Sequence, residues 1–427
     1  MRSTRAAAMV TLTLLMAAGC SPVPKAPPAS QIAPPAPADV VTIKVAVPRS
    51  ADPVLTEVLI PAFEARHKEY QVEAMRFEEK QQLKDAFRDK QVDVVPTDWL
   101  SRAEVPLFTL PLDGYLSKWK LDAAPFGGLL DSLVRDGRTY ELPYYTDNVG
   151  TFVYNVDMAK AAGVTIPADA WTWDEFRAAV AKLKGIGVWG LETVQHNTLT
   201  ELWLVGTTGQ PVWHADLAAL RQAIGLFHTM AFTDKSMPPA PTWNFTETGM
   251  QINIYKRELD AVTTGRAAMT FEMQTDIKDL PRELDSLHWD VAPMPSAPGA
   301  LPIVPVSLRT LGIAYDSRQP DAAWDFIAFA AGPEGAAAVA RAGYPPPYRS
   351  EETHKAWSEN REGYPPGVES IWSATWRVWQ TTGYAEPTDY MGNKRLMEFL
   401  KAQNWALSGQ KSLDEALAWF VAAEGGR

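Results

Sequence analysis

Residues 136–184 read DGRTYELPYYTDNVGTFVYNVDMAKAAGVTIPADAWTWDEFRAAVAKLK, and this stretch decides the fold. The β-branched and aromatic residues within 149–154 favour a largely buried strand. Thr172 and Glu175 form a predicted capping box, in which each side chain bonds the other residue's backbone amide, so a helix begins there. Gly185 stands where a left-handed cap would end that helix. The stretch therefore predicts strand, strand, short helix, loop and capped helix, an order that is typical of α/β proteins.

The part of the chain before this stretch has the pattern of a parallel sheet. Residues 40–47, 70–77 and 92–95 read as strands. Residues 81–90 read as a helix, and Asp52 can cap another one. This β-α-β-α-β order implies a mixed, mostly parallel sheet with helices on both faces.

The first twenty residues have the pattern of an export signal. Arg2 and Arg5 precede an apolar run over 6–18, which is too short to span a membrane as a helix. Cys20, the single cysteine, follows small residues at the end of this run. The pattern resembles a bacterial lipoprotein signal, which implies that residues 1–19 are the signal peptide and that Cys20 carries the lipid. The alternative interpretation is that Cys20 is a small buried thiol.

A spacer follows the lipidation candidate. Residues 20–38 contain seven prolines among small residues, so we expect an extended, semi-rigid linker. Lipoprotein signals usually carry a leucine three residues before the lipidated cysteine, and this chain has Ala17 at that position. Close to 390 residues remain after the linker, which is too long for one ordinary core and suits two lobes.

The order of the motifs resembles the extracellular solute-binding proteins, the maltose-binding-protein-like family that delivers carbohydrates to ABC importers. Within 136–184 the similar patterns are DG-x-x-Y-x-LPYYTD, FVYN-x-D and TWDEF. Further similar segments are GRAAMTF at 265–271, WDVAPMP at 289–295 and SGQKSLDEAL at 408–417. Where family members often carry Gly-x-Trp, residues 273–275 are Met-Gln-Thr, which argues against a standard maltodextrin site.

The resemblance implies an α/β, two-lobed, periplasmic-binding-protein-like fold of type II. Each lobe would be a mixed β-sheet flanked by helices, with hinge strands between the lobes. We expect residues 40–146 plus 312–346 to form the N-terminal lobe, and residues 147–311 plus 347–427 to form the C-terminal lobe. A ligand would bind between the lobes and be enclosed by hinge closure.

Catalysis is the less favoured interpretation of this sequence. The six histidines include no pair at metal-ligand spacing, and the chain has no nucleophile elbow and no phosphate-binding glycine loop. A formal charge of −11 without a basic cluster argues against nucleic acid as a partner. We therefore expect no catalytic residue, no metal and no cofactor. A secreted glycan-cleaving enzyme, which would need two buried carboxylates, stays open as the alternative from another class.

Sixteen tryptophans and thirteen tyrosines favour a carbohydrate ligand. Aromatic rings cover the apolar faces of sugars, while carboxylates, amides and guanidinium groups bond the hydroxyls. Most tryptophans nevertheless belong to cores, as helical spacing predicts for Trp173 and Trp324. The candidate ligand-binding residues are Asp98, Trp99, Tyr144, Tyr145, Asp147, Trp203, Trp243, Glu272, Gln274, Arg309, Tyr344, Trp372 and Trp376.

The resemblance implies a substrate-binding lipoprotein that captures a mono- or oligosaccharide and delivers it to an ABC permease with its ATPase. We expect a monomer that is exported and lipid-anchored at the outer face of the bacterial cytoplasmic membrane, or held in the periplasm. Other solutes in the same fold stay open. A glycerol phosphodiester would favour a basic cleft around Arg309, a polyamine would favour Asp98, Asp147 and Glu272, and a peptide is a third possibility.

Overall fold

The computed structural model describes most of the chain after the predicted linker. The signal peptide, Cys20 and the proline-rich spacer lie outside the described residues. No helix in the described part is both long and apolar enough to cross a membrane. The described ranges are 40–48, 52–89, 91–101, 103–119, 122–127, 129–147, 150–168, 170–193, 196–210, 212, 214–246, 249–251, 259–273, 280–300, 307–359 and 394–425.

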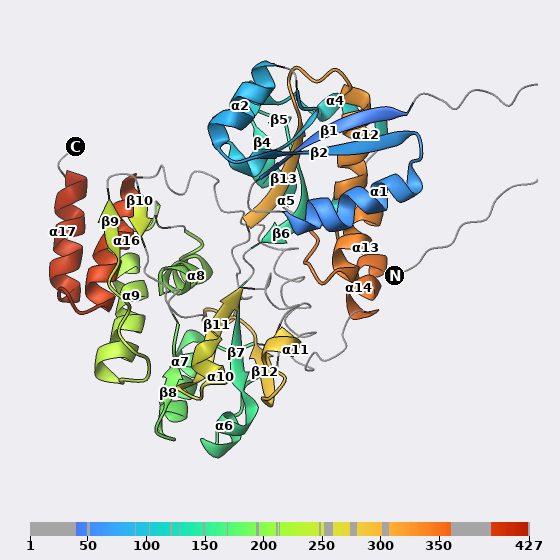
Figure 1. The fold of residues 1–427 in the computed structure, drawn as a ribbon. Helices are drawn as coiled ribbons and strands as arrows, with labels where there is room; N and C mark the ends of the chain where they lie inside the picture. Colours follow the sequence, from blue (N-terminus) through green and yellow to red (C-terminus); the bar gives the residue numbers. More distant parts are fainter. Residues whose placement is uncertain are drawn as a thin grey trace, which may run out of the picture. The chain divides into compact units, whose positions relative to one another are not determined.

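The first sheet has five strands in the order β2-β1-β3-β13-β6 (Figure 1). β1 pairs in parallel with β2 and β3, because helical segments connect these strands. β13 inserts between β3 and β6 and runs antiparallel to both, so the sheet is mixed. The strands are Val41–Pro48 (β1), Tyr70–Phe77 (β2), Val94–Pro96 (β3), Leu142–Asp147 (β6) and Ser307–Ile313 (β13).

Helices pack their aromatic residues against the first sheet. Trp324 is fully buried, as predicted, and its indole stacks on Tyr115 with ring centroids 5.3 Å apart. Phe63 meets Phe326 edge to face at 5.2 Å. The helical elements here are Val54–Leu59 (η1), Ile60–Arg66 (α1), Lys80–Arg88 (α2), Thr97–Trp99 (η2), Val105–Phe108 (α3), Asp113–Trp119 (α4), Ala124–Phe126 (η3), Leu129–Leu133 (α5), Pro320–Ala331 (α12) and Pro333–Arg341 (α13). Glu351–Glu359 (α14) packs on α13, and its Ala356 and Trp357 belong to another cluster, with Val153 and Trp289. A short hairpin is formed by Val134–Arg135 (β4) and Arg138–Thr139 (β5).

The second sheet has four strands in the order β12-β7-β11-β8. The central strand β7 runs antiparallel to β11 and β12, and β8 lies parallel to β11 at one edge. The strands are Gly150–Asn155 (β7), Trp189–Leu191 (β8), Ala267–Met273 (β11) and Trp289–Ala292 (β12). Two separate sheets, each with its own core, agree with the two-lobed prediction, while the division of the chain between the lobes at 146/147, 311/312 and 346/347 stays a prediction.

The core of the second lobe is rich in aromatic residues. Phe152 of β7 contacts Phe176 at 4.7 Å and Phe271 at 5.4 Å between ring centroids. Trp173 is buried against Phe176 and Phe227, as its helical position predicts. The helical elements are Val156–Ala161 (α6), Trp173–Lys184 (α7), His196–Thr208 (α8), Leu217–His228 (α9), Thr229–Thr233 (η4), Asp260–Thr263 (α10), Leu280–Glu283 (α11), Lys394–Leu407 (α16) and Leu413–Gly425 (α17), and a hairpin is formed by Asn244–Thr246 (β9) and Gly249–Gln251 (β10).

The predicted capping box at the start of α7 is confirmed. The Glu175 amide donates to Thr172 Oγ1 at 3.2 Å, and the Thr172 amide donates to Glu175 Oε2 at 2.7 Å. The prediction for the other end is wrong. Gly185 follows the helix but keeps a right-handed φ of −57°, whereas the left-handed conformation occurs at Gly187, with φ +89°.

Gly190 of β8 lies in close contact with α7. A Cβ added there would lie 2.0 Å from the carbonyl oxygen of Val180, and backbone cannot yield without separating helix from sheet. We expect Gly190→Ala to lower the free energy of unfolding by about 1–3 kcal/mol. Urea denaturation measures this loss. In the control Gly114→Ala, the added Cβ meets nothing within 4 Å, so equal stability of the two variants would contradict the prediction.

Candidate functional site

The carboxyl edge of the first sheet brings together polar residues from four segments. Asp98 follows β3, and Asp52 follows β1, which runs parallel to β3. β6 also ends at this edge, because β13 runs antiparallel to both β3 and β6. Arg309 lies on β13, opposite Tyr145 of β6. Open α/β sheets bind their ligands at this edge, so we call Asp52, Asp98, Tyr144 and Arg309 the carboxyl-edge cluster.

An ion pair holds Asp98 in a fixed orientation. Arg309 Nη1 lies 2.7 Å from Asp98 Oδ2, and the Asp98 side chain is only 12% exposed, compared with 33% for Arg309. The second oxygen, Asp98 Oδ1, is buried and has no hydrogen-bond partner among the described residues. The residues next to the pair in sequence are also bonded: Thr97 Oγ1 donates to Thr310 Oγ1 at 2.7 Å, which links η2 to β13. The cluster therefore holds one carboxylate oxygen that is positioned but not bonded.

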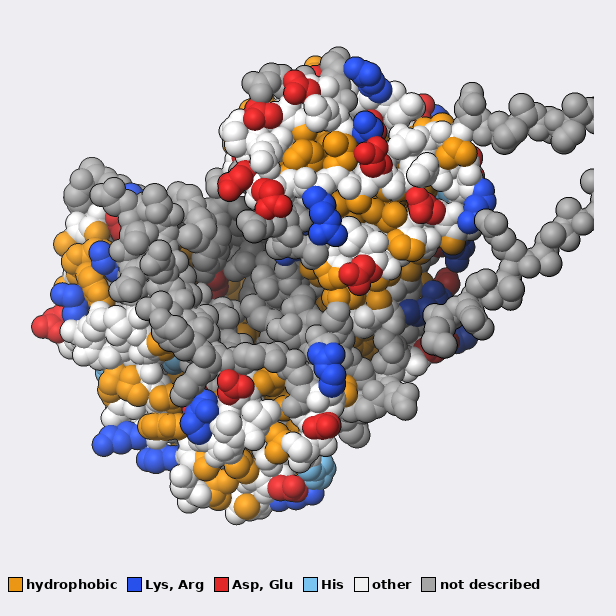
Figure 2. Space-filling model, in the orientation of Figure 1, with side chains coloured by type: hydrophobic (Ala, Val, Ile, Leu, Met, Phe, Trp, Pro, Cys, Tyr) orange, Lys and Arg blue, Asp and Glu red, His pale blue; other side chains and the backbone are white. Residues whose placement is uncertain are grey.

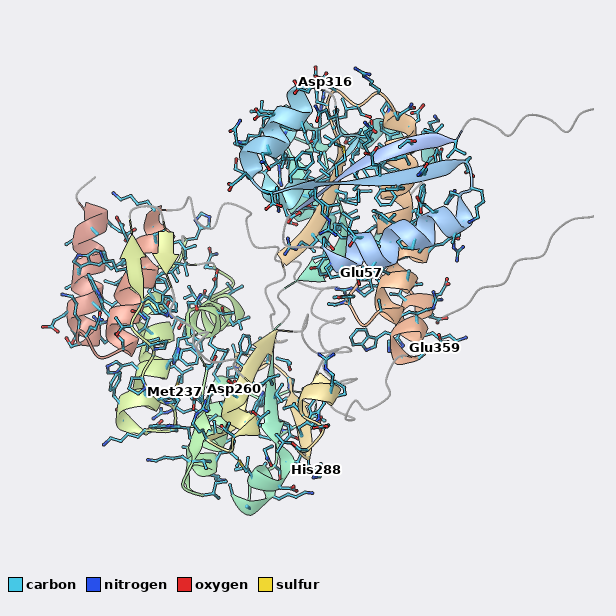
Figure 3. The ribbon with its side chains drawn as sticks, viewed as in Figure 1. Glu57, Met237, Asp260, His288, Asp316 and Glu359 are labelled. Atoms are coloured by element: carbon cyan, nitrogen blue, oxygen red, sulfur yellow. The ribbon has the colours of Figure 1, made fainter. Side chains whose placement is uncertain are left out.

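Asp52 is a member of the cluster that sequence reasoning assigned only to helix capping. Its Oδ1 accepts the amide of Leu55 at 2.9 Å, so the capping prediction is confirmed. Its Oδ2 accepts the phenol of Tyr144. Glu57, labelled in Figure 3, marks the helix η1 whose first turn receives this carboxylate. The only sequence signal that Asp52 belongs to the site was its position as a helix cap after a buried strand. Such caps are common, so this signal does not single out a site residue.

Burial sets the protonation of the cluster. Burial raises the pKa of Asp98 to about 6, although the nearby Arg309 guanidinium acts in the opposite direction and the negative Asp52 adds to the rise. Burial also raises the pKa of Asp52, partly offset by the bond from Tyr144. Burial, followed by the two carboxylates, raises the pKa of Tyr144 well above its ordinary value, so its phenol stays a donor. The cluster thus contains two carboxyl groups and one permanent cation.

The raised pKa of Asp98 predicts a pH-dependent stability. Because the folded pKa of about 6 lies above the ordinary 3.8, the folded state binds the extra proton between these values. Asp98 therefore contributes stability below about pH 4, and this contribution, up to about 3 kcal/mol, is lost as the pH rises through 6. Urea denaturation from pH 4 to 7 measures it. We expect Asp98→Asn to remove the part of this slope that comes from Asp98, while Asp52, whose pKa is also raised, keeps a pH dependence of its own. The same pH dependence of stability in Asp98→Asn and in the wild type would refute the assignment.

Three predicted tyrosines, of which Tyr144 belongs to the cluster, are packed as core. Tyr144 and Tyr145 meet at 5.5 Å between ring centroids, and Tyr145 meets Tyr344 at 5.9 Å, both edge to face. All three are buried. Trp99 is half-buried and packs partly on a hydrophobic cluster behind β3. Of these four aromatic side chains, Trp99 keeps the largest accessible part, so it is the one best suited to cover a ligand face.

The remaining predicted residues divide into two groups. Trp203 is buried in the core of the second lobe, and Trp243 is buried with its backbone amide bonded to Asn404 Oδ1 at 3.0 Å, so the structure does not bring either to the carboxyl-edge cluster. The backbones of Asp147 and Glu272 pair with Ser307 and Thr151. The side chains of those two residues, and all of Gln274, Trp372 and Trp376, lie outside the described residues.

The described part of the chain contains no cluster of side chains that could bind a metal ion. No three His, Cys, Asp or Glu side chains there lie close enough to hold a metal ion. The cluster at the sheet edge contributes two carboxyl groups, but Arg309 occupies the place beside Asp98 that a cation would take. The arrangement suits hydrogen bonding to a polar solute.

Comparison with known proteins agrees with this geometry. Residues 48–337 match the family described as bacterial extracellular solute-binding protein. No curated protein matches the chain. Among solved structures, a sugar transporter from Rhizobium etli in an open conformation is 22% identical with a TM-score of 0.74, and the alignment covers 90% of this chain and 98% of that one.

Two further structures have the same fold. The sugar-binding protein MalE from Xanthomonas citri is 18% identical with a TM-score of 0.68, over 89% of this chain and 95% of that one. An ABC substrate-binding protein from Listeria monocytogenes, in complex with cycloalternan, is 18% identical with a TM-score of 0.65, over 89% and 96%. The two-lobed, periplasmic-binding-protein-like fold predicted from the sequence is therefore confirmed.

Proposed function

Because the chain belongs to the family of bacterial extracellular solute-binding proteins, we propose that it is the substrate-binding subunit of an ABC importer and that its ligand is a carbohydrate. The observation that carries the proposal is Asp98 Oδ1, a buried carboxylate oxygen that Arg309 holds in place and that has no partner among the described residues. A charged acceptor makes stronger hydrogen bonds than a neutral one, and sugar hydroxyls are its natural donors.

Other groups at the sheet edge support a polyol ligand. Thr146 Oγ1 is buried and unbonded within the described part of the chain. Trp99 offers a partly accessible ring for an apolar sugar face. Asp147, at the end of β6, and Glu272, on β11 of the second lobe, are proposed to bond further hydroxyls once the lobes close. The ligand would then contact both lobes only in the closed form and would shift the balance toward it.

The charge of the cluster supports some of the other candidate solutes more than others. A phosphodiester needs an available cation. This ligand is disfavoured because the Arg309 guanidinium is already bonded to Asp98. A polyamine is the second candidate, because the two carboxyl groups outnumber the one guanidinium. A neutral sugar remains favoured because both oxygens of Asp52 already accept protein donors, which leaves little free carboxylate for an amine.

We further propose the cellular context that the family implies. Residues 1–19 would direct export, Cys20 would carry the lipid, and residues 20–38 would tether the two lobes at the outer face of the membrane. The division into lobes is proposed as 40–146 plus 312–346 and 147–311 plus 347–427. The monomer would present the closed form to a permease with its ATPase and would have no catalytic step of its own.

A ligand screen tests the proposed function. The purified chain is screened by thermal shift and tryptophan fluorescence against maltose, trehalose, glucose and xylose, with spermidine and glycerophosphocholine as competing classes. A ligand at 100 times its Kd raises the free energy of unfolding by about 2.7 kcal/mol, which a thermal shift detects. Stabilisation by spermidine alone would overturn the carbohydrate assignment, and release of the dye from a chromogenic glycan would establish an enzyme instead.

A further inference from the structure

The second lobe carries a groove at the end of its sheet that lies away from the proposed ligand contacts. The groove measures about 580 Å³ and is lined by Lys184, Gly187, Val188, Trp189, Lys235, Gly265 and Arg266. It lies where β11 begins, next to Arg266, whereas Glu272 is at the other end of that strand. Six residues of strand separate the two ends by roughly 20 Å. The groove is therefore a separate site.

Three cations line this groove, and two of them are held in place by the protein. Lys184 Nζ donates to the carbonyl oxygen of Asp234 at 3.0 Å. The Arg266 guanidinium donates to both carboxylate oxygens of Glu192, at 2.7 and 3.2 Å, and to the carbonyl oxygen of Asp260, which is labelled in Figure 3. Glu192 neutralises Arg266, so the unneutralised charge of the groove comes from the two lysines.

The Asp234 carboxylate forms its ion pair with Arg177 and with neither lysine of the groove, although the Lys184 charge contributes to lowering the pKa of Asp234. Asp234 is taken by Arg177, whose Nε and Nη2 lie 2.6 and 3.0 Å from its two oxygens. Neither Lys184 nor Lys235 forms an ion pair with a carboxylate anywhere in the described ranges. The groove therefore concentrates positive charge on a chain whose formal net charge is −11.

Lys235 occupies a backbone conformation that favours glycine. Its φ is +48°, in the left-handed region that side chains disfavour. The next residue is tied to β8, because the Ser236 carbonyl oxygen accepts the amides of Gly190 at 2.8 Å and Leu191 at 3.1 Å. A glycine would fit this turn at lower cost. A strained residue that carries an unpaired charge into a groove points to a function rather than to stability.

The remaining walls define the shape of the ligand. Trp189 is half-buried and is one of the residues that line the groove. Gly187 and Gly265 both have left-handed backbones and leave that wall without side chains. Figure 2 shows Lys and Arg side chains beside apolar ones over the part of the second lobe where α7 and β8 lie. The groove thus offers positive charge next to an aromatic surface.

We propose that this groove binds a phosphate group on an apolar or planar body, either a small organic phosphate or the headgroup of an anionic lipid. Two ammonium groups act as point charges that suit phosphate oxygens. The guanidinium fork that would select a planar carboxylate is already occupied by Glu192. The apolar part of the ligand would lie against Trp189.

Binding of phosphate probes by the full chain tests this proposal. One arm measures inorganic phosphate against chloride at equal ionic strength by titration calorimetry. The other measures sedimentation with phosphatidylglycerol vesicles against phosphatidylcholine vesicles. We expect Lys184→Gln and Lys235→Gly each to weaken binding roughly tenfold, since each removes a charged bond to the ligand. If the two variants weaken binding to the vesicles alone, the ligand is a lipid headgroup. If they weaken binding of inorganic phosphate, the ligand is a free phosphate.

A matched control separates this site from general charge effects. Lys68 Nζ donates to the Glu64 carbonyl oxygen at 2.9 Å, as Lys184 does to Asp234, but it lies in the first lobe. Lys68→Gln should leave phosphate and vesicle binding unchanged. Lys235→Gly should keep or raise the melting temperature, because it relieves the left-handed strain. The proposal is overturned if the wild type binds neither probe. It is also overturned if Lys68→Gln weakens binding as much as the groove variants do, or if acetate binds as tightly as phosphate.

Discussion

Asp98→Ala is expected to lower the affinity for the sugar that stabilises the protein most by about 100-fold, a loss of about 2–3 kcal/mol. The substitution removes a buried carboxylate oxygen that is oriented by Arg309 and has no hydrogen-bond partner among the described residues. It also removes the ion pair with Arg309. Titration calorimetry with that sugar measures the change.

Two further variants identify the cause of the expected loss. Asp98→Asn keeps the shape of the side chain but removes its charge, so its affinity should lie between those of the wild type and Asp98→Ala. Asp131→Ala removes an exposed carboxylate from α5 in the same lobe and should change nothing. If Asp98→Ala folds and binds the sugar as well as the wild type does, Asp98 is not a ligand contact.

Glu141→Ala is expected to lower the free energy of unfolding by about 3–5 kcal/mol. Glu141 lies directly before β6, and its Oε1 pairs with Arg135 Nη2 of the β4–β5 hairpin. The two side chains are only 1% and 7% exposed. Without the carboxylate, a guanidinium charge remains in a nearly dry environment, and this cost is much larger than the gain from the original pair. Urea denaturation measures the loss of stability.

The exposed pair Lys355–Glu359 is the matched control for this prediction. Its atoms lie 3.9 Å apart one helical turn from each other, and both side chains are largely solvated. Glu359→Ala should cost about 0.5 kcal/mol or less. The double variant Arg135→Met with Glu141→Leu should recover most of the stability, because it removes both charges. If Glu141→Ala lowers the free energy of unfolding by less than about 1 kcal/mol, the Arg135–Glu141 pair is not isolated from water.

The sequence predicted what depends on residues close together in the chain. A capping box needs two side chains three residues apart, and the one predicted at Thr172 with Glu175 was found. The same spacing forms a second box at Ser412 with Glu415. The buried position of Trp324 followed from helical spacing. Even local reasoning failed at Gly185, because a glycine after a helix permits a left-handed turn but does not require one.

The order of motifs also determined the family and the two-lobed fold, since a shared order of segments reflects a shared succession of strands and helices. What only the tertiary structure decided is the grouping of side chains at the sheet edge. Asp98 and Arg309 are 211 positions apart, and Asp52 and Tyr144 are 92 apart. They meet because β13 inserts antiparallel between β3 and β6. Residue spacing identifies a strand but not its partners, since pairing depends on which buried faces fit together across the whole lobe.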